Sequence, residues 1–94
     1  MLASEFLVKC LEEGPKIIFE LPGEENADFI MALKKSEKNR FVLTRHEQGV
    51  AYMAFGYAQS TGKPGVYAVV PGPGILNTTA ALSTAYACNS RVLA

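Results

Sequence analysis

The residues best suited to chemistry lie in the stretch Phe41–Gly49. Apolar residues Phe41–Leu43 lead into a polar run that contains the chain's only histidine, His46, and directly after it Glu47. This order predicts a buried strand that stops where a helix begins. In open α/β folds ligands bind beyond the carboxyl ends of strands, and the unpaired N–H groups of a first helical turn favour a carboxylate. Glu47 is therefore either a candidate for acid–base chemistry or simply a favourable helix start.

Spacing alone favours the plainer interpretation of both residues. An acid at a helix N-terminus is usually a capping or first-turn residue. One histidine without a nearby Cys–His spacing does not indicate a zinc site. No local pattern of Ser, His and acid indicates a nucleophilic triad. His46 is predicted to fix the turn or to line a pocket.

A second candidate is the turn Pro71–Gly74, which follows a predicted strand and opens a predicted helix, the usual place of phosphate-binding loops. The dinucleotide fingerprint requires glycine where Asn77 stands, and the Gly-Lys-Ser/Thr ending of a Walker loop is absent. Two prolines also remove two N–H donors that a phosphate would use. A nucleotide-binding domain is therefore disfavoured. The turn either lets a flat ligand or a partner approach closely, or is a tight turn without a ligand, and spacing alone favours the second interpretation.

Apolar periodicity and turn residues predict four helices and four strands in alternation. Strands alternating with helices imply parallel pairing with right-handed crossovers. The predicted fold class is α/β, a parallel β-sheet covered by helices. The predicted helices span residues 2–11, 24–35, 46–60 and 75–87, and the predicted strands span residues 16–19, 41–43, 66–70 and 91–94.

Glycines in the third predicted helix lie seven residues apart, so Gly49 and Gly56 share a face. Each costs about 1 kcal/mol of helix propensity relative to alanine. We expect the close approach of another backbone to compensate for this cost.

Composition narrows the class of protein and its partners. A formal net charge of zero offers no basic face for nucleic acid. No apolar run approaches membrane-spanning length, and Glu5 stands where a signal peptide would carry basic residues. Cys10 and Cys88 lie far apart, which predicts buried free thiols in a reducing compartment. These features predict a cytoplasmic protein whose partners are neither nucleic acid nor membrane.

Several motifs occur together in a fixed order over nearly the whole chain. They are Glu20-Leu21-Pro22-Gly23, Arg45-His46-Glu47-Gln48-Gly49, Gly56-Tyr57-Ala58 and Gly72-Pro73-Gly74. In this order the chain resembles the N-terminal, pyrimidine-binding domain of thiamine-diphosphate-dependent enzymes of the acetolactate synthase type. The resemblance implies the thiamine-diphosphate-binding fold, of which residues 1–94 are the N-terminal portion.

The resemblance assigns roles to individual residues. Glu47 matches the glutamate that exchanges a proton with the cofactor's aminopyrimidine ring and so activates the cofactor, which makes it the candidate catalytic residue. The candidate cofactor-binding residues are Glu47, Pro22, Gly23, Gly72, Pro73 and Asn77. No metal ligand is expected in this segment, because the family's magnesium ligands belong to a later domain.

The resemblance also implies an activity and partners. The cofactor would be thiamine diphosphate with Mg2+, acting as electron sink in the decarboxylation or carboligation of a 2-keto acid; whether FAD is also bound stays open. A second subunit would complete the site in a homodimer or homotetramer, and the 94 residues alone are predicted to be inactive.

Two departures leave the substrate undefined, since Glu20 and Pro71 stand where relatives often have Gly and Ser. The alternative hypothesis is a non-catalytic association module of the same lineage, suggested by the short length, the zero net charge and the glycine face.

Overall fold

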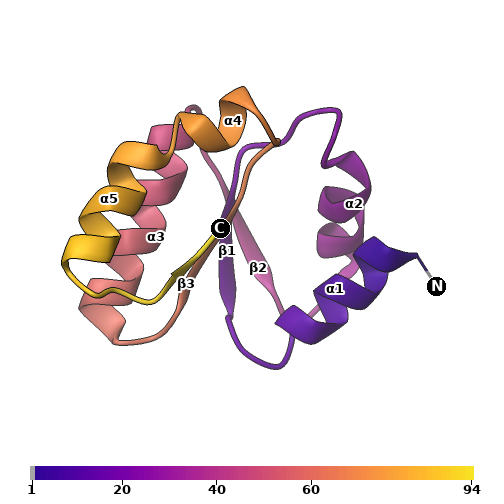
Figure 1. The fold of residues 1–94 in the computed structure, drawn as a ribbon. Coiled ribbons are helices and arrows are strands. Elements are labelled where there is room, and N and C mark those ends of the chain that lie inside the picture. Colours follow the sequence, from indigo (N-terminus) through magenta and orange to yellow (C-terminus); the bar gives the residue numbers. More distant parts are fainter. Residues whose placement is uncertain (1) are drawn as a thin grey trace.

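The computed structural model describes residues 2–94 as a four-stranded parallel sheet with helices on both faces (Figure 1). The predicted α/β class is confirmed. The helices are α1 (Ala3–Leu11), α2 (Ala27–Lys35), α3 (Glu47–Thr61), α4 (Pro73–Leu76) and α5 (Thr79–Ala87), and the strands are β1 (Ile17–Glu20), β2 (Arg40–Leu43), β3 (Gly65–Ala68) and β4 (Val92–Leu93).

The strand order is β2-β1-β3-β4, and every neighbouring pair is parallel. Ile18 at the centre of the sheet pairs with Phe41 on one side and Val66 on the other. Because parallel strands end at the same edge, the loops that follow β2, β1 and β3 are neighbours there. This edge is where the sequence-predicted site residues gather.

Side chains alternate between the two faces of the sheet and build a separate core on each. Helices α1 and α2 cover one face, where Ile18 and Val66 pack with Val8 and Leu33. Helices α3 and α5 cover the other face, where Phe19 belongs to the second core cluster. Figure 1 shows the sheet nearly edge-on between these two helical layers.

The second helix is shorter than predicted. The Gly23 N–H donates to Asn26 Oδ1 at 2.8 Å, so residues 24–26 form a turn and α2 begins only at Ala27. Asp28 lies in the first turn of α2, and Lys34 and Lys35 lie in its last turn, where each charge suits the helix dipole.

The predicted helix over residues 75–87 is divided into α4 and α5. At the junction the Thr78 hydroxyl donates to the Ile75 carbonyl at 2.6 Å, and the Thr78 N–H donates to the same oxygen at 3.0 Å. This tight turn interrupts the regular helical ladder. Strand β3 also ends two residues earlier than predicted, at Ala68.

Both cysteines are exposed and free, so the prediction of buried thiols is wrong. Cys10 lies two positions from the buried Val8, and two steps along a helix turn a side chain to the opposite side. Cys88 lies just past the end of α5.

Within the described residues no other segment approaches Gly49 or Gly56, since no atom outside the neighbouring residues and the backbone of α3 itself lies within 4 Å of a Cβ built at either position. The close approach occurs instead at Gly65, where a Cβ would overlap the Ala54 carbonyl of α3.

Candidate functional site

The candidate site lies at the edge where three strands end. Strand β2 leads into His46 and Glu47, β1 leads into Pro22 and Gly23, and β3 leads into the turn 71–74. The sheet order places the loop after β1 between the other two loops. The fold therefore brings all the sequence-predicted site residues to one side of the molecule.

Glu47 is the first residue of α3, and its side chain is 18% exposed. His46 caps this helix, because its Nδ1 accepts the Gln48 N–H at 3.0 Å. Because Nδ1 accepts a hydrogen bond, the hydrogen of a neutral imidazole lies on Nε2. The Nε2 atom lies 4.0 Å from Glu47 Oε2. The structure thus confirms that His46 fixes the turn and that Glu47 is a first-turn acid.

Asn77 reaches Glu47 from a different loop, 30 residues away in the sequence. Its Nδ2 donates to Glu47 Oε2 at 3.5 Å. The contact joins the end of α4 to the start of α3, and it brings together two residues that the sequence had singled out separately. One oxygen of the carboxylate is thereby tied to the protein.

A buried hydrogen bond between two hydroxyl groups fixes the residue that follows Asn77. Tyr67 is 2% exposed and Thr78 is fully buried; the Tyr67 hydroxyl donates to Thr78 Oγ1 at 2.8 Å. Burial raises the pKa of the Tyr67 hydroxyl, while the Thr78 hydrogen bond lowers it by less. The hydroxyl therefore stays protonated and keeps donating, which fixes the α4–α5 junction directly beside Asn77.

The turn between β3 and α4 depends on its glycine and proline for different reasons. Gly72 has a positive φ, in a region of backbone conformation that L side chains rarely adopt. Pro73 then occupies the first turn of α4, where its missing N–H costs nothing. Together the two residues place the start of α4 at the edge of the sheet.

Val70 connects the two glycine-containing turns and was missed in the sequence. A Cβ built on Gly74 would lie 2.7 Å from Val70 Cγ2, and one built on Gly23 would overlap Val70 Cγ1. Both glycines therefore leave room for the same valine. Two consecutive valines before a turn were the available signal, but they indicate a continuing strand equally well.

Glu20 ends β1 and is 1% exposed. Burial raises the pKa of its carboxyl, and the nearby Lys34 opposes this effect. Among the described residues its Oε2 has no hydrogen-bond partner. Because Glu20 alternates with Phe19, it faces the α1–α2 layer, on the opposite side of the sheet from α3.

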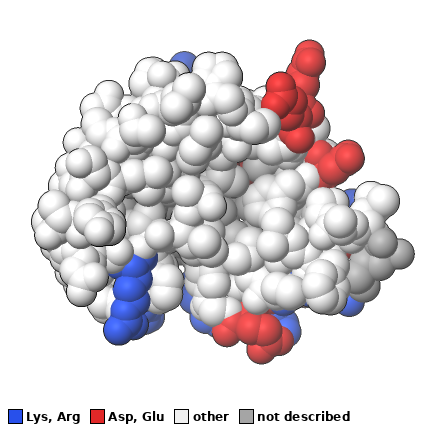
Figure 2. All heavy atoms as spheres, viewed as in Figure 1, with Lys and Arg blue, Asp and Glu red and all other residues white. Residues whose placement is uncertain are grey.

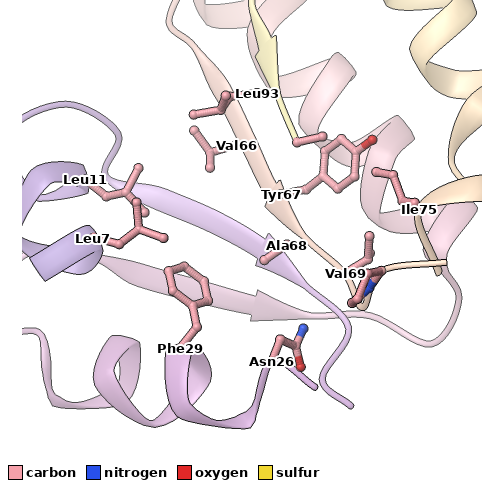
Figure 3. A pocket seen from close by; sticks show the side chains of 12 residues that line it. Leu7, Leu11, Asn26, Phe29, Val66, Tyr67, Ala68, Val69, Ile75 and Leu93 are labelled. Atoms are coloured by element: carbon pink, nitrogen blue, oxygen red, sulfur yellow. The ribbon is translucent and has the colours of Figure 1, made fainter. Parts of the chain in front are cut away.

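A cavity of about 510 Å³ lies between the α1–α2 layer and the β3–β4 side of the sheet, and at one end it reaches Pro71 and Ile75 beside the turn after β3. Figure 3 shows Leu7, Leu11 and Phe29 pointing toward the sheet there, with Val66 and Ala68 on its far wall. Its lining includes neither an acid nor a base other than Tyr67, whose hydroxyl is bonded to Thr78. The cavity therefore lacks the groups for proton transfer.

Residues 2–94 contain no cluster of three His, Cys, Asp or Glu side chains that could hold a metal ion. Within the same residues no helix has the length and the apolar character needed to cross a membrane.

The fold and site together define an α/β domain that presents an acid at the carboxyl edge of a parallel sheet. Residues 1–94 match the family model described as "Thiamine pyrophosphate enzyme, N-terminal TPP binding domain". The chain belongs to this family, as the order of its motifs predicted.

Among its curated relatives is a probable 2-ketoarginine decarboxylase of Pseudomonas aeruginosa, 43% identical over 93% of this chain and 16% of that protein. A probable acetolactate synthase large subunit of Methanocaldococcus jannaschii is 43% identical over 100% of this chain and 16% of its own length. The chloroplastic acetolactate synthase of Arabidopsis thaliana is 41% identical over 87% of this chain and 12% of its own length. The chain thus spans about one sixth or less of the length of these relatives.

Proposed function

We propose that residues 1–94 act within a longer chain as the pyrimidine-binding segment of a thiamine-diphosphate-dependent 2-keto acid decarboxylase or carboligase. The observation that carries the proposal is the placement of Glu47. Its carboxylate stands in the first turn of α3, at the edge of the sheet, and is held at one oxygen by a residue from a second loop. The family of the chain supplies the identity of the cofactor.

The residues at this edge fit an aminopyrimidine ring. Among the described residues the hydrogen bond to the Glu47 carboxylate reaches Oε2, which leaves Oε1 for a ligand. The turns on either side, Pro22–Gly23 and Gly72–Gly74, carry no charged side chain and offer backbone and small apolar groups to a flat ring. One acid beside such surfaces can bind the ring's edge and exchange a proton with it.

The roles proposed for the cofactor and for each residue follow from these contacts. Bound thiamine diphosphate would supply the electron sink for bond cleavage next to a keto group. Glu47 would hold and return a proton at its carboxylate. The two turns would border the cofactor, with Pro22 and Gly23 on one side and Gly72 and Pro73 on the other. Mg2+ and its ligands belong to the rest of the proposed protein.

We place a second subunit on the face formed by α3, α4 and α5. Between Gln48 and Ser90, Lys63 is the only charged residue. Figure 2 shows this side of the molecule almost without charged atoms, whereas acidic side chains stand out over the α2 side. Depletion of charge together with exposed aromatic residues and methionine is typical of protein interfaces. The exposed aromatic residues and methionine here are Tyr52, Met53 and Tyr86, and Leu76 adds an exposed aliphatic side chain.

The proposal names no particular 2-keto acid, because the relatives are named for different activities.

A cytoplasmic location is part of the proposal and is supported by two exposed free thiols, which persist in a reducing compartment. The association module without catalysis is not favoured, because the relatives are named as enzymes.

Isothermal titration of the full-length protein tests the proposal. We expect thiamine diphosphate with Mg2+ to bind and ATP with Mg2+ not to bind. Pyruvate and other 2-keto acids should then be tested for carbon dioxide release. Binding of ATP but not of thiamine diphosphate would contradict the proposal, as would saturation with thiamine diphosphate without turnover of any 2-keto acid tried.

A further inference from the structure

The contact between Asn77 and Glu47 assigns Asn77 a role different from direct cofactor binding. We infer that Asn77 is a positioning residue, which holds Oε2 of Glu47 so that Oε1 stays directed at its reaction partner. This inference rests on the proposed function of Glu47. It concerns how the carboxylate is oriented rather than whether it reacts.

Geometry gives the two oxygens of this carboxylate different surroundings. Asn77 Nδ2 donates to Oε2 at 3.5 Å, and His46 Nε2 lies 4.0 Å from the same atom. The His46 ring is itself held, because its Nδ1 accepts the Gln48 N–H. Two N–H groups from two loops therefore flank one oxygen. A carboxylate fixed in this way cannot exchange its two oxygens by rotation without losing a hydrogen bond.

Hydrogen bonds hold the backbone on both sides of the Asn77 side chain. Its own N–H donates to the Pro73 carbonyl at 3.0 Å, which closes the single turn of α4. The next residue, Thr78, is fully buried and anchored by the Tyr67 hydroxyl at 2.8 Å. The amide thus lies between the hydrogen-bonded turn of α4 and a buried hydrogen bond at the next residue. An exposed asparagine without such support would not direct a carboxylate.

The alternative role is direct contact between Asn77 and the cofactor, and the two roles differ in one respect. A residue that acts through Glu47 has no effect once Glu47 is replaced, whereas a residue that contacts the cofactor keeps its effect. A double-mutant cycle with Glu47→Gln and Asn77→Ala in the full-length protein separates them.

In the wild-type background Asn77→Ala should lower kcat about tenfold, the usual loss for one hydrogen bond to a charged group. The KM for the keto acid and the affinity for thiamine diphosphate by titration should stay within about twofold, the usual scatter for a residue that acts independently of both ligands. In the Glu47→Gln background Asn77→Ala should change neither kcat nor affinity. Equal losses in both backgrounds would overturn the inference.

Asn77→Asp keeps the size of the side chain but replaces the donor with a like charge, so it should lower kcat more than Asn77→Ala does. The matched control is Asn89→Asp. Asn89 is exposed, lies between α5 and β4, and has a positive φ, which aspartate also tolerates. This control should leave kcat unchanged. A loss equal to that of Asn77→Asp would overturn the inference.

A measurement without cofactor keeps this inference separable from the proposed function. In the unloaded protein the side-chain amide resonances of Asn77 should shift on Glu47→Gln, while those of Asn89 should not. If thiamine diphosphate fails to bind but this shift is seen, the proposed function is wrong and the contact stands. If thiamine diphosphate binds and the Asn77 resonances do not respond, the positioning role is wrong and the proposed function stands.

Discussion

Removing one buried hydroxyl group should loosen the junction that supports the candidate site. Tyr67→Phe deletes the donor to Thr78 Oγ1, a bond of 2.8 Å between side chains of residues that are 2% and 0% exposed. The phenyl ring keeps the packing, so the cost is mainly the hydrogen bond. A neutral buried hydrogen bond contributes about 1 kcal/mol. Because Thr78 keeps its own bond to the Ile75 carbonyl, we expect the free energy of unfolding to fall by about 1–1.5 kcal/mol.

Urea denaturation followed by far-UV circular dichroism measures this loss. Thr78→Val leaves the Tyr67 hydroxyl buried without a partner and should cost more, about 2 kcal/mol. In the double variant both partners are apolar, so its loss should be about 1 kcal/mol smaller than the sum of the single losses. Additive losses, or an unchanged midpoint for Tyr67→Phe, would refute the assigned coupling.

Two further stability predictions concern Glu20 and Gly74. Since burial raises the pKa of Glu20 above the usual 4.5, its contribution to stability is fully present below that pH and is lost as the pH rises through the folded-state pKa. Glu20→Gln should therefore raise the urea midpoint at neutral pH. It should also reduce the fall of the midpoint as the pH rises from mildly acidic to neutral. Glu13→Gln, a control at the far end of α1, should have neither effect. Gly74→Ala would press a Cβ against Val70 Cγ2, closer than van der Waals contact allows. It should cost about 1–3 kcal/mol, with part of the loss recovered by adding Val70→Ala. A neutral Gly74→Ala, measured by the same denaturation, would show that Val70 does not fill the space between the two turns.

Element type and order were predictable because each local pattern agreed with the fold. Apolar runs such as Ile17–Phe19 lie at the centre of the sheet, and glycine or proline marks most boundaries. The errors arose where side chains from distant parts of the chain meet. The break after α4 depends on Thr78, whose buried hydroxyl is bonded to Tyr67, 11 residues earlier. The apolar periodicity of one segment does not reveal a hydrogen-bond partner in another segment.

The candidate site divides in the same way. The position of Glu47 in a first helical turn followed from local sequence, and the structure confirms it. Its link to Asn77 spans 30 residues and depends on the sheet order, so spacing could not reveal it. Val70 was hidden for the same reason, because the two glycines it lies against belong to different loops.

The catalytic role proposed for Glu47 is tested most directly by the turnover of Glu47→Gln in the full-length protein saturated with thiamine diphosphate. Glutamine keeps the shape of the side chain but cannot exchange a proton. We expect kcat for the 2-keto acid to fall by at least about 100-fold, the lower end of general acid–base contributions. A kcat equal to that of the wild type, with the cofactor demonstrably bound, would contradict the role given to this carboxylate.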